Sequence, residues 1–230
     1  MADNSVSRAQ RGNDDVLKRL VSINQGPSGR PNLAMTFDDG PHPTNTPILL
    51  DILKARRIRA TFYVVGRNGA AYPDLLKRMV DEGHELGNHT WSHPRLTALG
   101  EAGLLQQLDR TSEAIYKAVK KVPVTMRPPY GQLHPWQARM IHAKRAMVTT
   151  LWNVDPRDWQ RPGASVVASR IVAASRNGSI ILAHDIHRPT VRAMPAALDG
   201  LAGKGFHFAT VSMLLGARDW SRKRFRWVSG

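Results

Sequence analysis

The chain has 230 residues, of which 42% are hydrophobic and 22% charged, as expected for a folded domain with a full core. It contains no cysteine, which excludes disulfides and thiolate metal sites and leaves histidine and carboxylate to hold any transition metal. Lys and Arg outnumber Asp and Glu by 33 to 18, and the net charge of +15 predicts attraction to polyanions. A merely basic, solvated surface explains the same charge equally well.

The two ends of the chain differ from its middle in composition. Residues 1–30 are polar and predict a flexible N-terminal arm, with a short helix over residues 16–23. Residues 31–217 are predicted to form one catalytic domain, and residues 218–230 a basic C-terminal tail. The tail is expected to be solvated or to contact an anionic surface weakly, and no specific nucleic-acid partner is expected.

The sequence carries no segment that predicts membrane insertion or export. No apolar run approaches the roughly 18 residues that span a bilayer, and the N-terminus lacks the apolar part of a secretory signal. As written, the chain is expected in the cytoplasm, or in the periplasm or outside the cell if a leader has been removed.

From residue 33 onward, short apolar runs that predict strands alternate with helical patterns. The predicted strands cover residues 33–37, 60–65, 85–88, 124–127, 147–152, 179–183 and 206–211. The predicted helices cover residues 45–56, 72–82, 101–119, 135–143, 164–175 and 191–202. Repeated strand-then-helix units predict an α/β fold with a parallel sheet, either open or closed into a barrel.

Polar residues stand at the carboxyl ends of these predicted strands, where parallel sheets bind their ligands. The clusters are Asp38 and Asp39 after the first strand, His89 and His93 after the third, Arg127 after the fourth, Asp155 and Asp158 after the fifth, and His184 after the sixth. Five clusters on one face are hard to explain as solvated turns.

Asp39, His89 and His93 form a candidate metal site. The two histidines are four residues apart, so on a helical turn their rings would point the same way. Two histidines and one carboxylate leave an open coordination position, which is typical of a catalytic site. The ligand set suits Zn²⁺, Co²⁺, Ni²⁺ or Fe²⁺, and the open position would hold a water whose pKa falls towards neutrality.

The remaining clusters provide a general base and a general acid. Asp38 adjoins the metal ligand and is placed to take a proton, while His184 could protonate a leaving group from the other side. Arg127 can hold Asp38 through a bidentate contact, and a carboxylate can keep His184 protonated. Asp155 and Asp158 are both available for that contact; Asp158 is preferred because it adjoins a tryptophan. This set predicts hydrolysis of an amide or an ester.

Five stretches, in order, resemble the five motifs of the polysaccharide deacetylases, and the similarity covers most of the chain from residue 33 onward. They are Thr36–Gly40, His89–His93, Arg127–Gly131, Asp155–Trp159 and Leu182–His184. Residues 155–163 are especially similar to nodulation-type chitooligosaccharide deacetylases.

The resemblance implies a distorted (β/α)₇ barrel, in a single domain, that acts on linear amides as a polysaccharide N-deacetylase. The expected substrate is an acetylated amino-sugar oligomer or polymer of the chitooligosaccharide or peptidoglycan type. It implies one divalent metal, with Zn²⁺ expected ahead of Co²⁺ or Ni²⁺. It implies the Tyr130 backbone N–H as oxyanion donor, Leu182 in the acetyl pocket and Trp159 as a groove wall. Two alternatives stay open: an amidase of a small non-sugar amide, and a basic polyanion-binding module.

Overall fold

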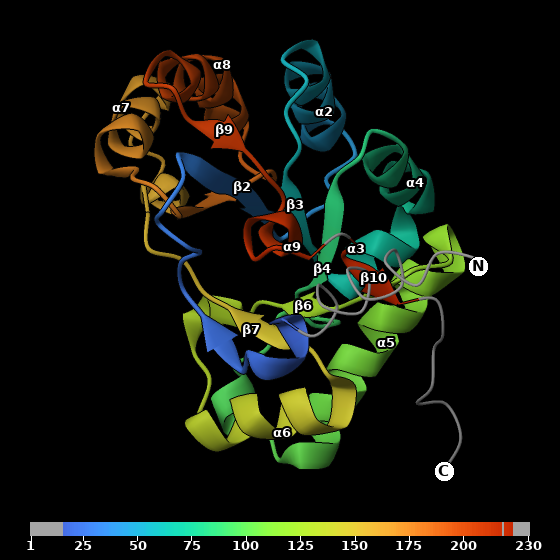
Figure 1. Ribbon diagram of the computed structural model, residues 1–230. Helices are drawn as coiled ribbons and strands as arrows, with labels where there is room; N and C mark the ends of the chain where they lie inside the picture. The colour runs from blue at the N-terminus through green and yellow to red at the C-terminus, as the bar shows by residue number, and fades with distance from the viewer. Residues whose placement is uncertain (1–15, 218, 223–230) are drawn as a thin grey trace, which may run out of the picture.

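The protein is a parallel half-barrel wrapped by helices, described by a computed structural model for residues 16–217 and 219–222 (Figure 1). Seven strands pair in the order β1-β7-β6-β4-β3-β2-β8, and every neighbouring pair on this path is parallel. These strands are β1 (Ser22–Ile23), β2 (Asn32–Asp38), β3 (Thr61–Val64), β4 (Glu85–Asn88), β6 (Thr125–Met126), β7 (Val148–Thr150) and β8 (Ile180–His184). A further short strand, β9 (His207–Phe208), pairs with β2.

Helices surround the sheet on its outer side (Figure 1). They are α2 (Asn45–Ala55), α3 (Gly66–Ala71), α4 (Pro73–Asp81), α5 (Glu101–Val119), α6 (Pro135–Arg145), α7 (Ala164–Ala174) and α8 (Arg188–Gly203). Their apolar faces cover the sheet, so central strands such as β2 and β3 are buried along almost their whole length. A strand buried on both faces reads as a continuous apolar run, which is why the sequence pattern of these strands does not alternate.

Among the described residues, the end strands β1 and β8 share no ladder, and only isolated contacts link the two ends of the half-barrel. The Leu182 N–H donates to the Val154 carbonyl over 2.9 Å, and the Gly26 N–H donates to the Gly178 carbonyl over 2.8 Å. These contacts use residues that follow β7 and β1. The barrel is therefore distorted, as the resemblance implied.

The amino ends of the strands are capped by the short helix α9 (Val211–Leu214). The buried carboxylate of Glu85, at the start of β4, accepts hydrogen bonds from the Ser212 backbone N–H (2.8 Å) and hydroxyl (2.9 Å). The Thr61 hydroxyl, at the start of β3, accepts from the Val211 N–H over 2.9 Å. Because α9 fills this end, the opening of the barrel is left to the carboxyl ends.

The largest differences from the predicted elements lie at the two ends of the domain. Part of the predicted N-terminal arm is built into the fold: residues 16–19 are helical, and β1 pairs with β7. The first residues of the predicted tail are also packed, because β10 (Ser221–Arg222) pairs with β5 (Val122–Pro123) and Trp220 is 9% exposed. Two-residue strands have too little periodicity to be recognised in a sequence. Residues 1–15 of the arm and residues 218 and 223–230 of the tail lie outside the described residues.

Other elements follow the prediction with small changes. Helix α5 and strand β4 have the predicted bounds, whereas the last predicted strand shrinks to the two residues of β9. Helix α3 was not predicted, since its sequence (Gly66–Ala71) contains two glycines and no apolar stripe. Within the described residues, no helix is long and apolar enough to cross a membrane.

Candidate active site

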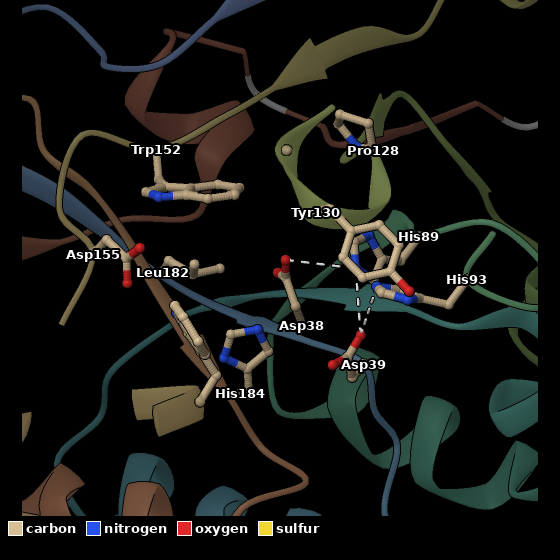
Figure 2. Close-up of a pocket in the computed structure, with 12 residues that line it drawn as sticks. Asp38, Asp39, His89, His93, Pro128, Tyr130, Trp152, Asp155, Leu182 and His184 are labelled. Atoms are coloured by element: carbon tan, nitrogen blue, oxygen red, sulfur yellow. Dashed lines mark ion pairs between the residues drawn. The ribbon is translucent and has the colours of Figure 1, made fainter. Parts of the chain in front are cut away.

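Parallel pairing brings the predicted site residues to one end of the barrel. Asp38, the last residue of β2, is the register partner of His184, the last residue of β8. The ladder from β3 through β4 to β6 places Asn88 beside Val64 and Met126, so the residues after β4 and β6 emerge at the same end. In the view of Figure 2, the acidic pair Asp38 and Asp39 lies between His184 on one side and His89 on the other.

The three predicted metal ligands converge. The Nε2 atoms of His89 and His93 lie 3.4 and 3.3 Å from Asp39 Oδ1, and the candidate ligand atoms all lie within 4.8 Å of one another. Asp39 Oδ1 is buried and has no hydrogen-bond partner in the described part of the chain. A buried carboxylate oxygen facing two imidazole nitrogens is costly unless a cation or a proton lies between them, so these residues fit a bound divalent metal.

A backbone contact determines which nitrogen of His89 is free. Its Nδ1 lies 2.7 Å from the Arg127 carbonyl oxygen. A carbonyl can only accept, so the proton sits on Nδ1 and the lone pair on Nε2 faces Asp39. Such an outer hydrogen bond is the usual way in which a metal-binding histidine is oriented.

The segment from His89 to His93 is a loop, so the two rings do not meet through the geometry of a helical turn. Thr90 and His93 have φ values of 67° and 60°, in the left-handed region. The Thr90 N–H donates to Asn88 Oδ1 (2.9 Å), and the His93 N–H donates to the Thr90 hydroxyl (3.1 Å). The two rings still meet, with centroids 4.9 Å apart, because side-chain contacts and not helical periodicity bend the loop.

Arg127 is fully buried and holds Asp38 through one nitrogen. Its Nη1 donates to Asp38 Oδ1 and to the Thr36 hydroxyl, each over 2.7 Å. Its Nε donates to the Thr150 carbonyl and its Nη2 donates to the Leu151 carbonyl, each over 3.2 Å. The predicted bidentate contact is therefore wrong, because backbone carbonyls occupy the rest of the donor fork. Asp38 Oδ2 stays available and lies 3.7 Å from His89 Nε2.

Asp158, and not Asp155, contacts His184. Asp158 Oδ1 accepts from His184 Nδ1 over 2.9 Å, and its Oδ2 accepts from the His184 backbone N–H (2.8 Å) and the Thr190 hydroxyl (2.9 Å). Burial alone would lower the pKa of His184, but the hydrogen bond and charge of Asp158, with the charges of Asp38 and Asp39, raise it to about 9. A charged ring carries protons on both nitrogens. Because Asp158 holds the proton on Nδ1, the proton that His184 can give up is the one on Nε2.

The local backbone explains why Asp158 points inward and its neighbour outward. A one-turn helix, η3 (Asp158–Gln160), is flanked by Arg157 and Arg161, both with φ of 55°. Asp158 is 1% exposed, whereas Trp159 is 51% exposed at the mouth of the site. Asp155 lies at the pocket wall, where its Oδ1 accepts the Arg157 N–H over 2.8 Å.

A cavity of about 410 Å³ joins these groups, a size suited to a small ligand. Eight of the ten predicted site residues line it, while Arg127 and Asp158 lie behind Asp38 and His184. Its walls include Leu182, which is almost fully buried, and the half-exposed rings of Tyr130 and Trp159. The complete lining is Asp38, Asp39, His89, His93, Pro128, Tyr130, Gly131, Trp152, Asp155, Trp159, Leu182 and His184.

Sequence reasoning missed several residues that hold or line this site. Thr36 and Thr190 bind Arg127 and Asp158 through their hydroxyls, and Asn68 Nδ2 donates to the Asp39 carbonyl over 2.8 Å. Thr36 stands inside the first motif, but a lone threonine in a strand is no signal of a buried hydrogen bond. Asn68 and Thr190 lie outside the five motifs, and only the fold brings them to the site.

An acid–base pair and a metal-type cluster at the carboxyl end of a parallel barrel define a hydrolase-type site. The polysaccharide deacetylase family profile matches residues 25–151, more than half of the chain. A chitooligosaccharide deacetylase of Bradyrhizobium sp. is 38% identical over 202 residues, covering 81% of this chain and 92% of the relative. The chain therefore belongs to the polysaccharide deacetylase family.

Other relatives extend the comparison to peptidoglycan enzymes. The peptidoglycan-N-acetylglucosamine deacetylase PgdA of Listeria monocytogenes is 35% identical over 90% of this chain, which spans only 44% of that relative's length. The crystal structure of the Bc1960 peptidoglycan N-acetylglucosamine deacetylase superposes with a TM-score of 0.84 at 30% identity, covering 90% of this chain and 97% of that one. The chitin deacetylase of Colletotrichum lindemuthianum superposes with a TM-score of 0.83 at 29% identity, covering 90% and 98%.

Proposed function

We propose that the protein removes N-acetyl groups from glycans that contain N-acetylglucosamine, releasing acetate and leaving a free amine. One observation carries the proposal: a base, a protonated acid and a metal-type ligand cluster face one cavity. The fold alone does not establish this activity, because a pseudoenzyme from Bacillus anthracis has a similar fold. It superposes with a TM-score of 0.79 at 27% identity, covering 84% of this chain and 68% of that one.

The side chains divide the proton transfers between the two sides of the cavity. Asp38, held by Arg127, takes the proton from water as the water oxygen attacks the acetamide carbon. The backbone N–H of Tyr130 is the proposed donor to the oxyanion that forms. His184 gives its Nε2 proton to the nitrogen as the C–N bond breaks, because an amine is too basic to leave without one.

The ligand set proposed for the metal is Asp39, His89 and His93, and the proposed metal is Zn²⁺, with Co²⁺ or Ni²⁺ as alternatives. When bound, a divalent cation supplies Lewis acidity, which makes water a nucleophile near neutral pH. Elemental analysis of the protein after purification without chelators identifies the ion. If the His89→Ala variant keeps the zinc content of the wild type, the assignment is wrong.

The activity is tested by acetate release from chitin oligomers, peptidoglycan and small linear amides, assayed side by side with Asp38→Asn as the inactive control. We expect release from at least one glycan and little from the small amides. Turnover of small amides alone would favour a non-sugar amidase. Binding of glycan without acetate release, in protein shown to contain metal, would favour a binding module and contradict the proposal.

Charge at the mouth of the cavity favours the peptidoglycan type of substrate, whose stem peptides carry free carboxylates. The Arg95 guanidinium lies 4.7 Å from the centroid of the Tyr130 ring, at one edge of the mouth. Arg161 stands two residues after Trp159, and its charge, together with burial and the charge of His184, lowers the pKa of His187. In the described part of the chain neither arginine is paired with a carboxylate, so both can meet a carboxylate of the substrate.

The test compares Arg95→Gln and Arg161→Gln on peptidoglycan fragments and on neutral chitin oligomers. We expect each change to raise KM for the carboxylate-bearing substrate by about 1.5- to 5-fold, as for a lost exposed ion pair, and to leave KM for the neutral one unchanged. Arg56→Gln is the control, since it removes the same charge from an ion pair with Asp199. Equal effects on both substrates would contradict a carboxylate-binding role.

We also propose that the basic tail gives weak attraction to anionic surfaces. Residues 223–230 contain Lys223, Arg224 and Arg226 among aromatic side chains. Truncation after Arg222 keeps Trp220 and β10 in place and should reduce binding to anionic vesicles without changing turnover of a neutral oligomer. Unchanged vesicle binding would leave the tail as a solvated end.

A further inference from the structure

One buried carboxyl group at the site has no part in the acid–base chemistry. Asp185 follows His184 directly, is 0% exposed, and does not line the cavity. Its Oδ2 accepts a short hydrogen bond from the Thr46 hydroxyl, at the start of α2. Its Oδ1 has no hydrogen-bond partner in the described part of the chain. A buried carboxyl group with one unpaired oxygen lowers stability, and such groups are few in native proteins.

Asp185 packs directly against the turn that follows the metal ligand Asp39. A Cβ atom added to Gly40 would collide with both carboxyl oxygens of Asp185, so the carboxyl group occupies the space beside the Gly40 Cα. The same Thr46 hydroxyl accepts the His42 N–H over 2.8 Å, which ties the far end of the turn to the same group. Asp185 therefore contacts Gly40 at one end of the turn and Thr46 at the other, and it reaches His42 through the Thr46 hydroxyl.

The turn needs such support because Asp39 has an unfavourable backbone conformation. Its φ is 76°, in the left-handed region that a non-glycine residue keeps only where its surroundings hold it. From the α3 side, Asn68 Nδ2 donates to the Asp39 carbonyl (2.8 Å) and the Val65 N–H donates to the Gly40 carbonyl (3.1 Å). Asp185 supplies the contact from the β8 side.

We infer that Asp185 is a positioning residue for the metal site: its carboxyl group, with Thr46, holds the turn after β2 so that Asp39 Oδ1 stays between His89 and His93. The inference rests on the proposed metal-dependent function, because it assigns Asp185 a role only through that ligand. It does not require a charge on Asp185. Burial raises the pKa of this group to about 7, so an uncharged side chain of the same shape should serve nearly as well.

The experiment measures Co²⁺ binding, which does not depend on turnover, by calorimetry and by the visible spectrum of the bound ion. Asp185→Ala should weaken Co²⁺ binding by about 10- to 100-fold, the usual effect of losing an outer support of a metal ligand, and should change the spectrum. Asp185→Asn keeps the volume and an acceptor for Thr46, so it should stay within about threefold of the wild type. Thr46→Val should weaken binding, and Thr46→Ser should not.

Ser212→Ala is the matched control. Ser212 is also buried and donates to a buried carboxylate, Glu85, but at the opposite end of the barrel. We expect it to lower Tm without changing Co²⁺ affinity or the spectrum. Wild-type affinity and spectrum in both Asp185→Ala and Thr46→Val, despite a lower Tm, would show that Asp185 only stabilises the fold. If Asp185→Ala does not fold, the Thr46 pair decides. A wild-type protein that binds no Co²⁺ would overturn the metal site itself, and the inference with it.

Discussion

Replacing Asp158 with Asn removes the charge that keeps His184 protonated and changes few atoms. The pKa of His184 is raised from 6.5 to about 9, against a burial effect that lowers it. A shift of that size corresponds to about 3 kcal/mol in favour of the charged ring. Without the Asp158 charge, we expect the pKa of His184 to return to its ordinary value or below, because burial remains.

The consequence depends on pH in a way that separates it from simple misfolding. At pH 8 the protonated fraction of His184 should fall from about 0.9 to about 0.03, a loss of roughly 30-fold in kcat/KM. At pH 6 the loss from this cause should be less than about twofold. A bound cation would lower the pKa of His184 in the wild type and in the variant alike. The informative quantity is therefore the difference in pH between the alkaline declines of the two proteins.

The assay is acetate release from a neutral chitin oligomer between pH 5 and 10, with wild type and variant at equal metal content. Wild-type activity should decline as the pH rises through the pKa of His184, and the variant should decline about 2 pH units earlier. The free energy of unfolding should depend on pH in the same direction as activity. The raised pKa of His184 makes a contribution to stability that is complete below pH 6.5 and is lost as the pH rises through about 9. An alkaline limb at the same pH in both proteins would refute the assignment of His184 as the acid.

Three further predictions address the remaining groups. His89→Ala should remove the metal and abolish turnover while the circular dichroism spectrum persists; normal metal content would contradict its role as a ligand. Asp38→Asn should keep the metal but lose roughly 10²- to 10⁴-fold in kcat, the usual contribution of a general base, and recovery of full rate on adding metal would mean that the roles of Asp38 and Asp39 are exchanged. His184→Ala should reduce hydrolysis of amides far more than of an acetyl ester of an acidic phenol, whose leaving group needs no proton; equal losses would point to binding of substrate or oxyanion instead.

Much of the fold follows from local sequence pattern. Apolar runs such as that before Asp38 become buried strands because helices cover the outer face of the sheet and the interior of the barrel buries the inner face. Long amphipathic segments such as Glu101–Val119 become helices with the predicted bounds. The polar clusters could be assigned to one end of the barrel because parallel strands all present their carboxyl ends together. Metal ligands, base and acid were therefore predictable as a set from their order along the chain.

The contacts within that set depended on the tertiary structure. The sequence left both Asp155 and Asp158 available and favoured Asp158 only through its neighbouring tryptophan. In the structure, Asp158 contacts His184, and residues with left-handed backbone flank η3 on both sides. Arg127 binds Asp38 with one nitrogen because backbone carbonyls of the β7 segment take the others. Asp185 and Thr46 are 139 positions apart and meet only because β8 lies beside β2. Sequence periodicity reports which face of an element is buried, whereas the partner of a buried polar group is determined by distant segments and by left-handed turns that leave no periodic signal.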